Sequence, residues 1–147
     1  MRDRISATGL PHLPSGGTAL DTAREVAEVL DELAGILVGA RAIVEVAALP
    51  PVVAEPTAFR AAIAALVSDA VTHRGGMRPR IRVTADRCDA AWRITVGDNG
   101  LPVEARACGA GPASGAGAAV RGLGGALTTL PGLDGGVLSS FTVPAPA

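Results

Sequence analysis

Apolar residues recur at every third or fourth position between Leu20 and Leu37, and acidic residues fill many of the positions between them. This period predicts an amphipathic helix with its acids on the outer side. A second helical pattern covers residues 57–73, with Thr57 as the expected N-cap and Gly75-Gly76 as the expected stop. The first half of the chain therefore predicts two helices.

The second helix carries one acid at the border of its apolar face. At about 100° per residue, one face collects four apolar side chains, those of Phe59, Ile63, Leu66 and Ala70. Asp69 lies about a quarter turn from the centre of that face, so we expect it to border the core. A solvated helix acid is the alternative interpretation, because charged residues on helices are usually exposed.

Five strands are predicted, at about residues 42–47, 80–85, 91–97, 126–130 and 137–143. Residues 80–97 form a hairpin that is expected to turn at residues 86–89, and its alternation suits a sheet with one buried face. We expect helices on that inward face. The predicted fold is α/β, a two-layer α/β sandwich whose mixed sheet is covered on one face by helices.

The strand at residues 91–97 ends in a carboxylate. Because strand side chains alternate, Asp98 falls on the apolar side with Ile94 and Val96. A carboxylate on a buried face needs hydrogen-bond donors, and Gly100 leaves room for a ligand to approach the backbone. A bound amine, such as the exocyclic amine of a purine, would supply a donor. Asp98-Asn99-Gly100 is also an ordinary Asx-turn sequence, which is the alternative interpretation.

Three segments together resemble a known family. Residues 65–73 are similar to its N-box, residues 98–102 to its first glycine box, and residues 139–144 to its closing strand. In this order and spacing they resemble the ATP-binding catalytic domain of sensor histidine kinases, in the GHKL ATPase superfamily. The resemblance covers residues 18–144, and His73-Arg74-Gly75-Gly76 is similar to the bacteriophytochrome-like branch.

The resemblance implies ATP and Mg²⁺ as cofactors, bound between the helices and the sheet. It makes Asp98 and Gly100 the adenine-binding residues and Asp69 the candidate Mg²⁺ ligand, since a carboxylate is a hard oxygen donor. His73 and Arg74 are then expected near the nucleotide.

The second glycine box has two candidates in this chain. Gly109 and Gly111 are preferred to Gly115 and Gly117, because the first pair leaves room for a helix of about three turns. A low-complexity Ala/Gly linker is the alternative for this region.

The chain also departs from the family pattern. Ala65 and Asp69 stand where the N-box carries asparagines, and Thr72 stands where the family has a lysine that contacts phosphate. Arg74 is a candidate substitute, although a guanidinium fork does not replace an ammonium directly. Pro102 occupies the second glycine of the first box, which stiffens the expected hinge of a short lid at residues 101–108. The N-box and glycine boxes are thus degenerate, and a weakened activity is expected.

Composition and charge favour a single domain that neither binds nucleic acid nor spans a membrane. We expect one domain over residues 18–147 after a flexible lead at residues 1–17. A net charge of -1 gives no basis for nucleic-acid binding. Two isolated cysteines, Cys88 and Cys108, predict reduced thiols, and the longest apolar runs are far shorter than the roughly 20 residues of a membrane helix. A cytoplasmic protein without membrane contact is expected.

We expect these residues not to include the helical hairpin that carries the phosphoacceptor histidine in the family. His12 lies between Pro11 and Pro14, which forbid a continuous helix around it. The expected function is therefore the ATP-binding catalytic domain of a two-component kinase, acting on a histidine-bearing helical-hairpin domain or signalling protein. Two alternatives stay open: a degenerate, non-catalytic docking or phosphotransfer-assembly module, and an anti-sigma-factor-type serine kinase.

Overall fold

A five-stranded sheet forms one layer of the protein. The structure, a computed structural model, describes residues 17–106, 115–132 and 135–147. The strand order is β2-β4-β5-β7-β6, in which β2 and β4 are parallel and the other neighbours are antiparallel. The strands are β2 (Ile43–Val46), β4 (Arg80–Cys88), β5 (Ala91–Asp98), β6 (Thr128–Pro131) and β7 (Val137–Pro144). The predicted mixed sheet is confirmed.

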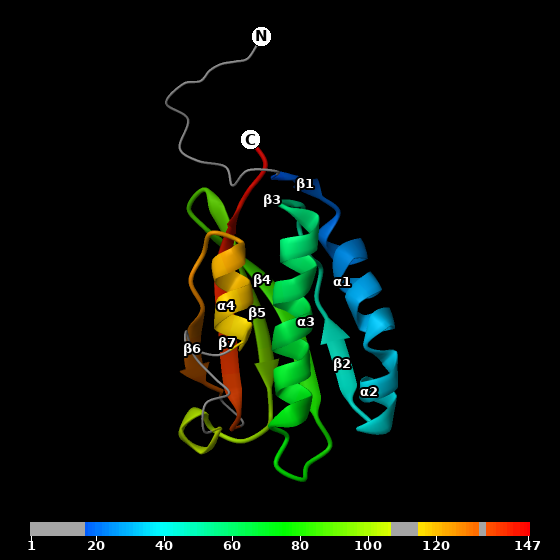
Figure 1. Cartoon of the computed structure of the whole chain (residues 1–147). Helices are drawn as coiled ribbons and strands as arrows, with labels where there is room; N and C mark the ends of the chain where they lie inside the picture. The colour runs from blue at the N-terminus through cyan, green and yellow to red at the C-terminus, as the bar shows by residue number, and fades with distance from the viewer. Residues whose placement is uncertain (1–16, 107–114, 133–134) are drawn as a thin grey trace.

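Helices form the second layer. Figure 1 shows α1 (Thr22–Glu32), α3 (Pro56–Thr72) and α4 (Gly115–Gly122) side by side on one face of the sheet. The predicted two-layer sandwich is therefore confirmed. Within the described residues, no helix is long and apolar enough to cross a membrane.

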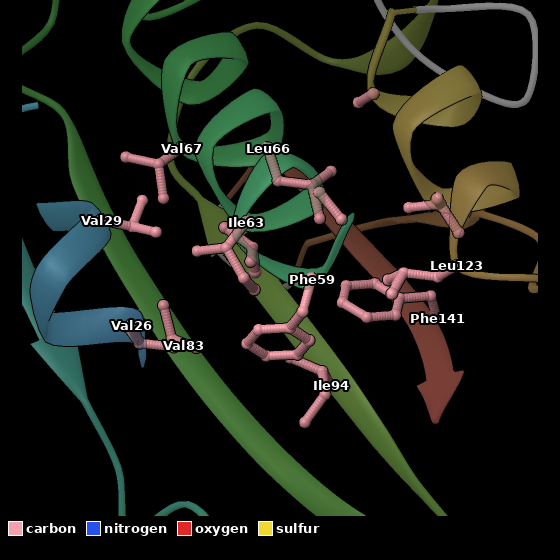
Figure 2. Packing of buried hydrophobic residues seen from close by; sticks show 14 of the residues in the cluster. Val26, Val29, Phe59, Ile63, Leu66, Val67, Val83, Ile94, Leu123 and Phe141 are labelled. Atoms are coloured by element: carbon pink, nitrogen blue, oxygen red, sulfur yellow. The ribbon is translucent and has the colours of Figure 1, made fainter. Parts of the chain in front are cut away.

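The core lies between the two layers. Figure 2 shows Val26 of α1 and Ile63 of α3 above Val83 and Ile94 of the sheet. Phe59 of α3 meets Phe141 of β7 edge to face, with ring centroids 6.3 Å apart and an interplanar angle of 64°, a favoured aromatic geometry. All four side chains of the predicted apolar face of α3 are buried. The helix periodicity thus identified the correct face.

The first predicted helix is interrupted and begins later than the pattern suggested. Leu20 belongs to β1 (Thr18–Leu20), and Asp21 caps α1 because its carboxylate accepts a hydrogen bond from the Arg24 amide. The helix ends before Leu33, and α2 (Ala34–Gly39) follows, with glycines that lower its helix propensity. The prediction of one continuous helix is wrong, as apolar spacing alone does not register caps.

A small second sheet was not predicted. Strands β1 and β3 (Val52–Ala54) pair antiparallel beside the first helices. Each has three residues, too few to produce a recognisable alternation. These pairs hold the chain that enters α3.

The N-cap of α3 is Glu55 instead of Thr57. The Glu55 carboxylate accepts hydrogen bonds from the amides of Thr57, at 3.0 Å, and Ala58, at 2.9 Å. Pro56 takes the first helical position, where its fixed φ suits the helix and its missing N–H is not needed. These amide contacts hold the pKa of the Glu55 carboxyl below its ordinary value. The prediction of a Thr57 cap is therefore wrong by two residues.

Two boundaries in the second half also differ from expectation. The hairpin turn is tighter than predicted, since β4 extends to Cys88 and Asp89 adopts a left-handed φ of 55°. Strand β6 starts at Thr128, two residues late. Within the described residues α4 has eight residues and includes Gly115 and Gly117; residues 112–114, where the predicted helix of about three turns would begin, lie outside them.

Candidate functional site

Strand β5 places the Asp98 carboxylate on the helix side of the sheet. Its neighbour in the register is Ile81 of β4, and only 6% of the Asp98 side chain is exposed. The Oδ1 atom accepts a hydrogen bond from the Gly100 amide at 2.9 Å, which closes an Asx-turn. The predicted inward direction and the alternative turn are thus both present in the same residue.

Arg106 pairs with this carboxylate. Residues Val103–Ala105 form a short 3₁₀ helix, η1, and Arg106 follows it directly. Its Nη2 donates to Asp98 Oδ1 at 2.6 Å, and its Nε donates to the Leu101 carbonyl at 2.7 Å. Only 3% of the Arg106 side chain is exposed. The buried carboxylate therefore has a donor from within the chain.

Sequence interpretation missed Arg106. A weak signal was available, because Glu104 and Arg106 are the only charged residues between Asp98 and Arg121. A buried carboxylate requires donors, so the one cation in the segment that follows it was the natural candidate. The placement of Arg106 depends on η1, which has no periodic signature.

Gly100 is required by a contact within the protein. A Cβ at this position would lie 2.3 Å from the His73 carbonyl oxygen and 3.2 Å from the Arg74 Cα. Next to it, the Leu101 amide donates to the same His73 carbonyl at 2.8 Å. The end of β5 is thus fastened to the C-terminal end of α3. In Figure 1 both lie at the end of the molecule opposite to the C-terminus.

Asn99 fastens the loop between α3 and β4 to the same corner. Its Oδ1 accepts a hydrogen bond from the Arg80 amide at 2.8 Å, and its Nδ2 donates to the Arg78 carbonyl at 3.2 Å. Asp98, Asn99 and Gly100, the first three residues of the first glycine box, therefore each make a different structural contact.

Gly136 forms the wall beside the carboxylate. It has a φ of 73°, and a Cβ there would lie 2.0 Å from the Asp98 carbonyl oxygen and 2.8 Å from Oδ1. Only glycine leaves this space to the backbone of β5. The start of β7 is consequently packed directly against the candidate site.

Asp69 lies near this cluster, at the predicted border of the core. It is half-buried, and burial raises the pKa of its carboxyl, while the charges of His73 and Arg106 lower it and that of Asp98 raises it. Asp69, His73, Asp98 and Arg106 are therefore within electrostatic reach of one another. The solvated helix acid is not what the structure shows.

Solved structures share this fold. The chain matches the nucleotide-free catalytic domain of the histidine kinase ThkA with a TM-score of 0.71, at 18% identity over 87% of this chain and 95% of that chain. The ATP-binding domain of PrrB from Mycobacterium tuberculosis gives 0.70 at 19% identity, over 90% of this chain and 99% of that chain. This is the histidine kinase catalytic fold.

A third match contains a nucleotide analogue. Full-length ShkA in complex with AMPPNP gives a TM-score of 0.69 at 17% identity, over 89% of this chain and 32% of that chain. Neither a protein-family model nor a curated protein matches the sequence. The bacteriophytochrome-like branch and the degeneracy of the boxes stay predictions.

Within this histidine kinase catalytic fold, Ala65 and Asp69, the predicted N-box departures, lie on α3, and Thr72 and Arg74 lie at its C-terminal end. Thr72 is the last residue of the helix and is exposed, and half-buried Arg74 begins the following loop. Pro102 is the residue before η1, with a φ of -66°. The local backbone accommodates Thr72, Arg74 and Pro102, because an exposed helix end, a loop and a φ of -66° suit these residue types.

Of the two candidate pairs for the second glycine box, only Gly115 and Gly117 lie within the described residues. Gly115 and Gly117 lie inside α4, so they do not precede the helix as a phosphate loop would. Gly109 and Gly111, the preferred pair, lie outside the described residues, as do His12, Cys108 and residues 1–16. The lid at residues 101–108 is described as far as Arg106, where it contains η1.

A groove of about 710 Å³ lies elsewhere on the sheet. Its lining includes Glu45, Arg82 and Leu138 from neighbouring strands, together with Ile81 and Asp98. The helices pack against the opposite face of the sheet, where Val83 and Ile94 are buried. The groove is therefore not the predicted site between helices and sheet.

Proposed function

We propose that this chain binds ATP with Mg²⁺ as the catalytic domain of a two-component sensor histidine kinase in the cytoplasm. It would transfer the γ-phosphoryl group to a histidine on a separate helical-hairpin domain or signalling partner. The observation that carries the proposal is the buried Asp98 carboxylate at the end of β5, beside Asp69, in the fold of histidine kinase catalytic domains. The AMPPNP complex of ShkA supports a nucleotide as the ligand.

Asp98 would accept a hydrogen bond from the adenine amine. The Asp98→Asn substitution turns one acceptor oxygen into a donor that faces the amine. We expect ATP binding to weaken by about 2 kcal/mol, as when a buried polar group loses its partner. Isothermal titration calorimetry measures this loss, and equal affinity for both proteins would remove Asp98 from the adenine site.

Asp69 would take part in Mg²⁺ binding only together with the nucleotide. Within the described residues, no group of three or more His, Cys, Asp or Glu side chains is placed so that it could hold a metal ion. Mg²⁺ usually takes one or two carboxylates, with phosphates and waters completing its shell. One carboxylate near the phosphates fits this pattern, and His73, Arg74, Gly109 and Gly111 are the proposed surroundings of the nucleotide.

The metal role is testable without turnover. If Asp69 faces the phosphates, its charge repels ATP that lacks Mg²⁺. Asp69→Asn should then raise the affinity for ATP in EDTA, whereas Asp89→Asn, in the exposed hairpin turn, should leave it unchanged. No change for Asp69→Asn would return this residue to a structural role.

Phosphoryl transfer is proposed to be slow. Thr72 supplies no positive charge, Pro102 restricts the hinge, and the lid is short; each removes part of the electrostatic clamp. Losses of about 1.4 kcal/mol for each feature would lower the rate roughly a thousandfold in total. A radiolabel transfer assay with a matched histidine-bearing hairpin compares wild type with Thr72→Lys/Pro102→Gly. Transfer by wild type at ordinary kinase rates would contradict the proposed weakening.

The Asp98–Arg106 ion pair favours a second candidate, a docking or assembly module without nucleotide. The pair satisfies the buried carboxylate from within the chain, so the fold is complete without a ligand. Calorimetry separates the two functions, because this candidate predicts no heat of ATP binding in the presence of Mg²⁺.

A further inference from the structure

The Arg106 guanidinium lies where the ligand amine is proposed to bind. Both groups are N–H donors toward the Asp98 carboxylate, whose Oδ1 already accepts hydrogen bonds from the Gly100 amide and from Arg106 Nη2. Only 3% of the Arg106 side chain and 6% of the Asp98 side chain are exposed, so the guanidinium covers the carboxylate at this 2.6 Å contact. We propose that Arg106 is an internal competitor of the nucleotide: its guanidinium occupies the amine position of Asp98 and lowers the affinity for ATP. This inference rests on the proposed function.

The local backbone allows Arg106 to leave. Its segment is held by two hydrogen bonds of η1, from the Ala105 amide to Pro102 and from the Arg106 amide to Val103. Glu104 and Ala105 are exposed, and a 3₁₀ turn of three residues is a weak element. Release of the side chain therefore requires little else in the core to move.

Opening the ion pair is nevertheless unfavourable. A buried ion pair that loses one partner leaves an uncompensated charge. The apparent dissociation constant of a ligand increases in inverse proportion to the fraction of molecules that are competent to bind it. If the pair were open in about one molecule in ten, the nucleotide would bind about tenfold more weakly than to an open site.

The competitor predicts two effects of opposite sign in one variant. Arg106→Gln removes the cation and leaves the Asp98 charge with a single strong donor, so the ligand-free protein should melt at a lower temperature than wild type. The same variant should bind ATP·Mg²⁺ at least about tenfold more tightly, which equals about 1.4 kcal/mol. A purely structural ion pair would lower stability without raising affinity.

The experiment is calorimetry of ATP·Mg²⁺ with wild type, Arg106→Gln, Arg106→Lys and Arg93→Gln. Arg93 serves as the matched control because it pairs with Asp86 on the exposed hairpin, at 3.0 Å. Arg106→Lys protects the test against a folding failure of Arg106→Gln. An ammonium cannot reach both Leu101 and Asp98 with the planar fork that arginine uses, so a smaller gain in affinity is expected. Arg93→Gln should leave the affinity unchanged.

Selectivity adds a second readout. Inosine triphosphate carries an oxygen in place of the adenine amine, so Asp98 gains nothing from it. The gain from Arg106→Gln should therefore appear with ATP and be absent with inosine triphosphate.

The outcomes separate the two proposals. Tighter ATP binding by the Arg106 variants supports the competitor, including the case in which wild type shows no binding. If wild type binds ATP and the variants bind equally or more weakly, the competitor is wrong while the proposed function stands. If neither wild type nor the variants bind ATP, the nucleotide function is wrong and the competition falls with it.

Discussion

Asp98→Asn tests whether the Asp98–Arg106 pair stabilises the folded chain. The substitution keeps the shape of the side chain but removes its charge, and Arg106 would then lie buried with only the Leu101 carbonyl as a strong partner. Removing one partner of a buried ion pair costs about 3–5 kcal/mol. The hydrogen bonds of the Asn99 side chain and of the Leu101 amide persist, so we expect the lower limit, about 3 kcal/mol.

A loss of about 3 kcal/mol lowers Tm by roughly 10 °C in a chain of this length. Urea denaturation of wild type, Asp98→Asn, Arg106→Gln and the double variant measures the interaction directly. The double variant should lose less than the sum of the single losses, with a coupling of about 2 kcal/mol. Only a buried charge pair produces a coupling of that size, because exposed pairs contribute about 0.2–1 kcal/mol.

The exposed pair of Arg93 and Asp86 supplies the control for this cycle. Its side chains are 45% and 56% exposed, so Asp86→Asn and Arg93→Gln should each have a small effect and couple weakly. Equal losses for Asp98→Asn and Asp86→Asn would refute the view that the buried pair is a major stabilising contact. Non-additivity confined to the Asp98 cycle would support it.

Three further substitutions probe the same corner and the helix that supports it. Gly136→Ala should destabilise the chain by at least about 2 kcal/mol, because its methyl group meets the Asp98 backbone and the residue has a positive φ; chemical denaturation checks this. Burial raises the folded pKa of Asp69, so its charged form is disfavoured, and the penalty is absent below the unfolded value of 3.8 and grows as pH rises through the folded pKa. Asp69→Asn should therefore raise Tm at pH 7, with a difference that vanishes near pH 3. Glu55 has a lowered pKa, so its capping contribution is present above its ordinary value of 4.5 and is lost as pH falls through the folded pKa; melting curves of Glu55→Gln against pH should converge with wild type only in acid.

Periodicity predicted the parts of the fold that bury repeated apolar positions. Helix α3 and the hairpin of β4 and β5 have long one-sided patterns, so their faces were identified correctly. Strands β1 and β3 were missed because three residues carry too little alternation. The break at Leu33 depends on cap geometry and a following glycine, which the apolar pattern does not encode.

In the candidate site, too, the residues with a local sequence pattern were predicted and those without one were missed. Asp98 was predicted because its direction follows from the strand that precedes it. Arg106 was missed because its position depends on a short irregular turn eight residues later. Gly100 was interpreted as space for a ligand, whereas the structure fills that space with the His73 carbonyl. Contacts between segments distant in sequence leave no local pattern from which to infer them.

The hydrogen bonds of Asn99 and Gly100 also bear on chemical ageing. In flexible peptides an Asn-Gly pair deamidates readily, because the glycine nitrogen attacks the neighbouring side-chain amide. Here the Gly100 N–H is directed at Asp98, and the Asn99 amide is held by Arg78 and Arg80. While this corner stays folded, the Gly100 nitrogen is therefore not oriented to attack the Asn99 side-chain amide. Accumulation of aspartate and isoaspartate at position 99 would therefore act as a slow clock of local opening, readable by peptide mass spectrometry after storage.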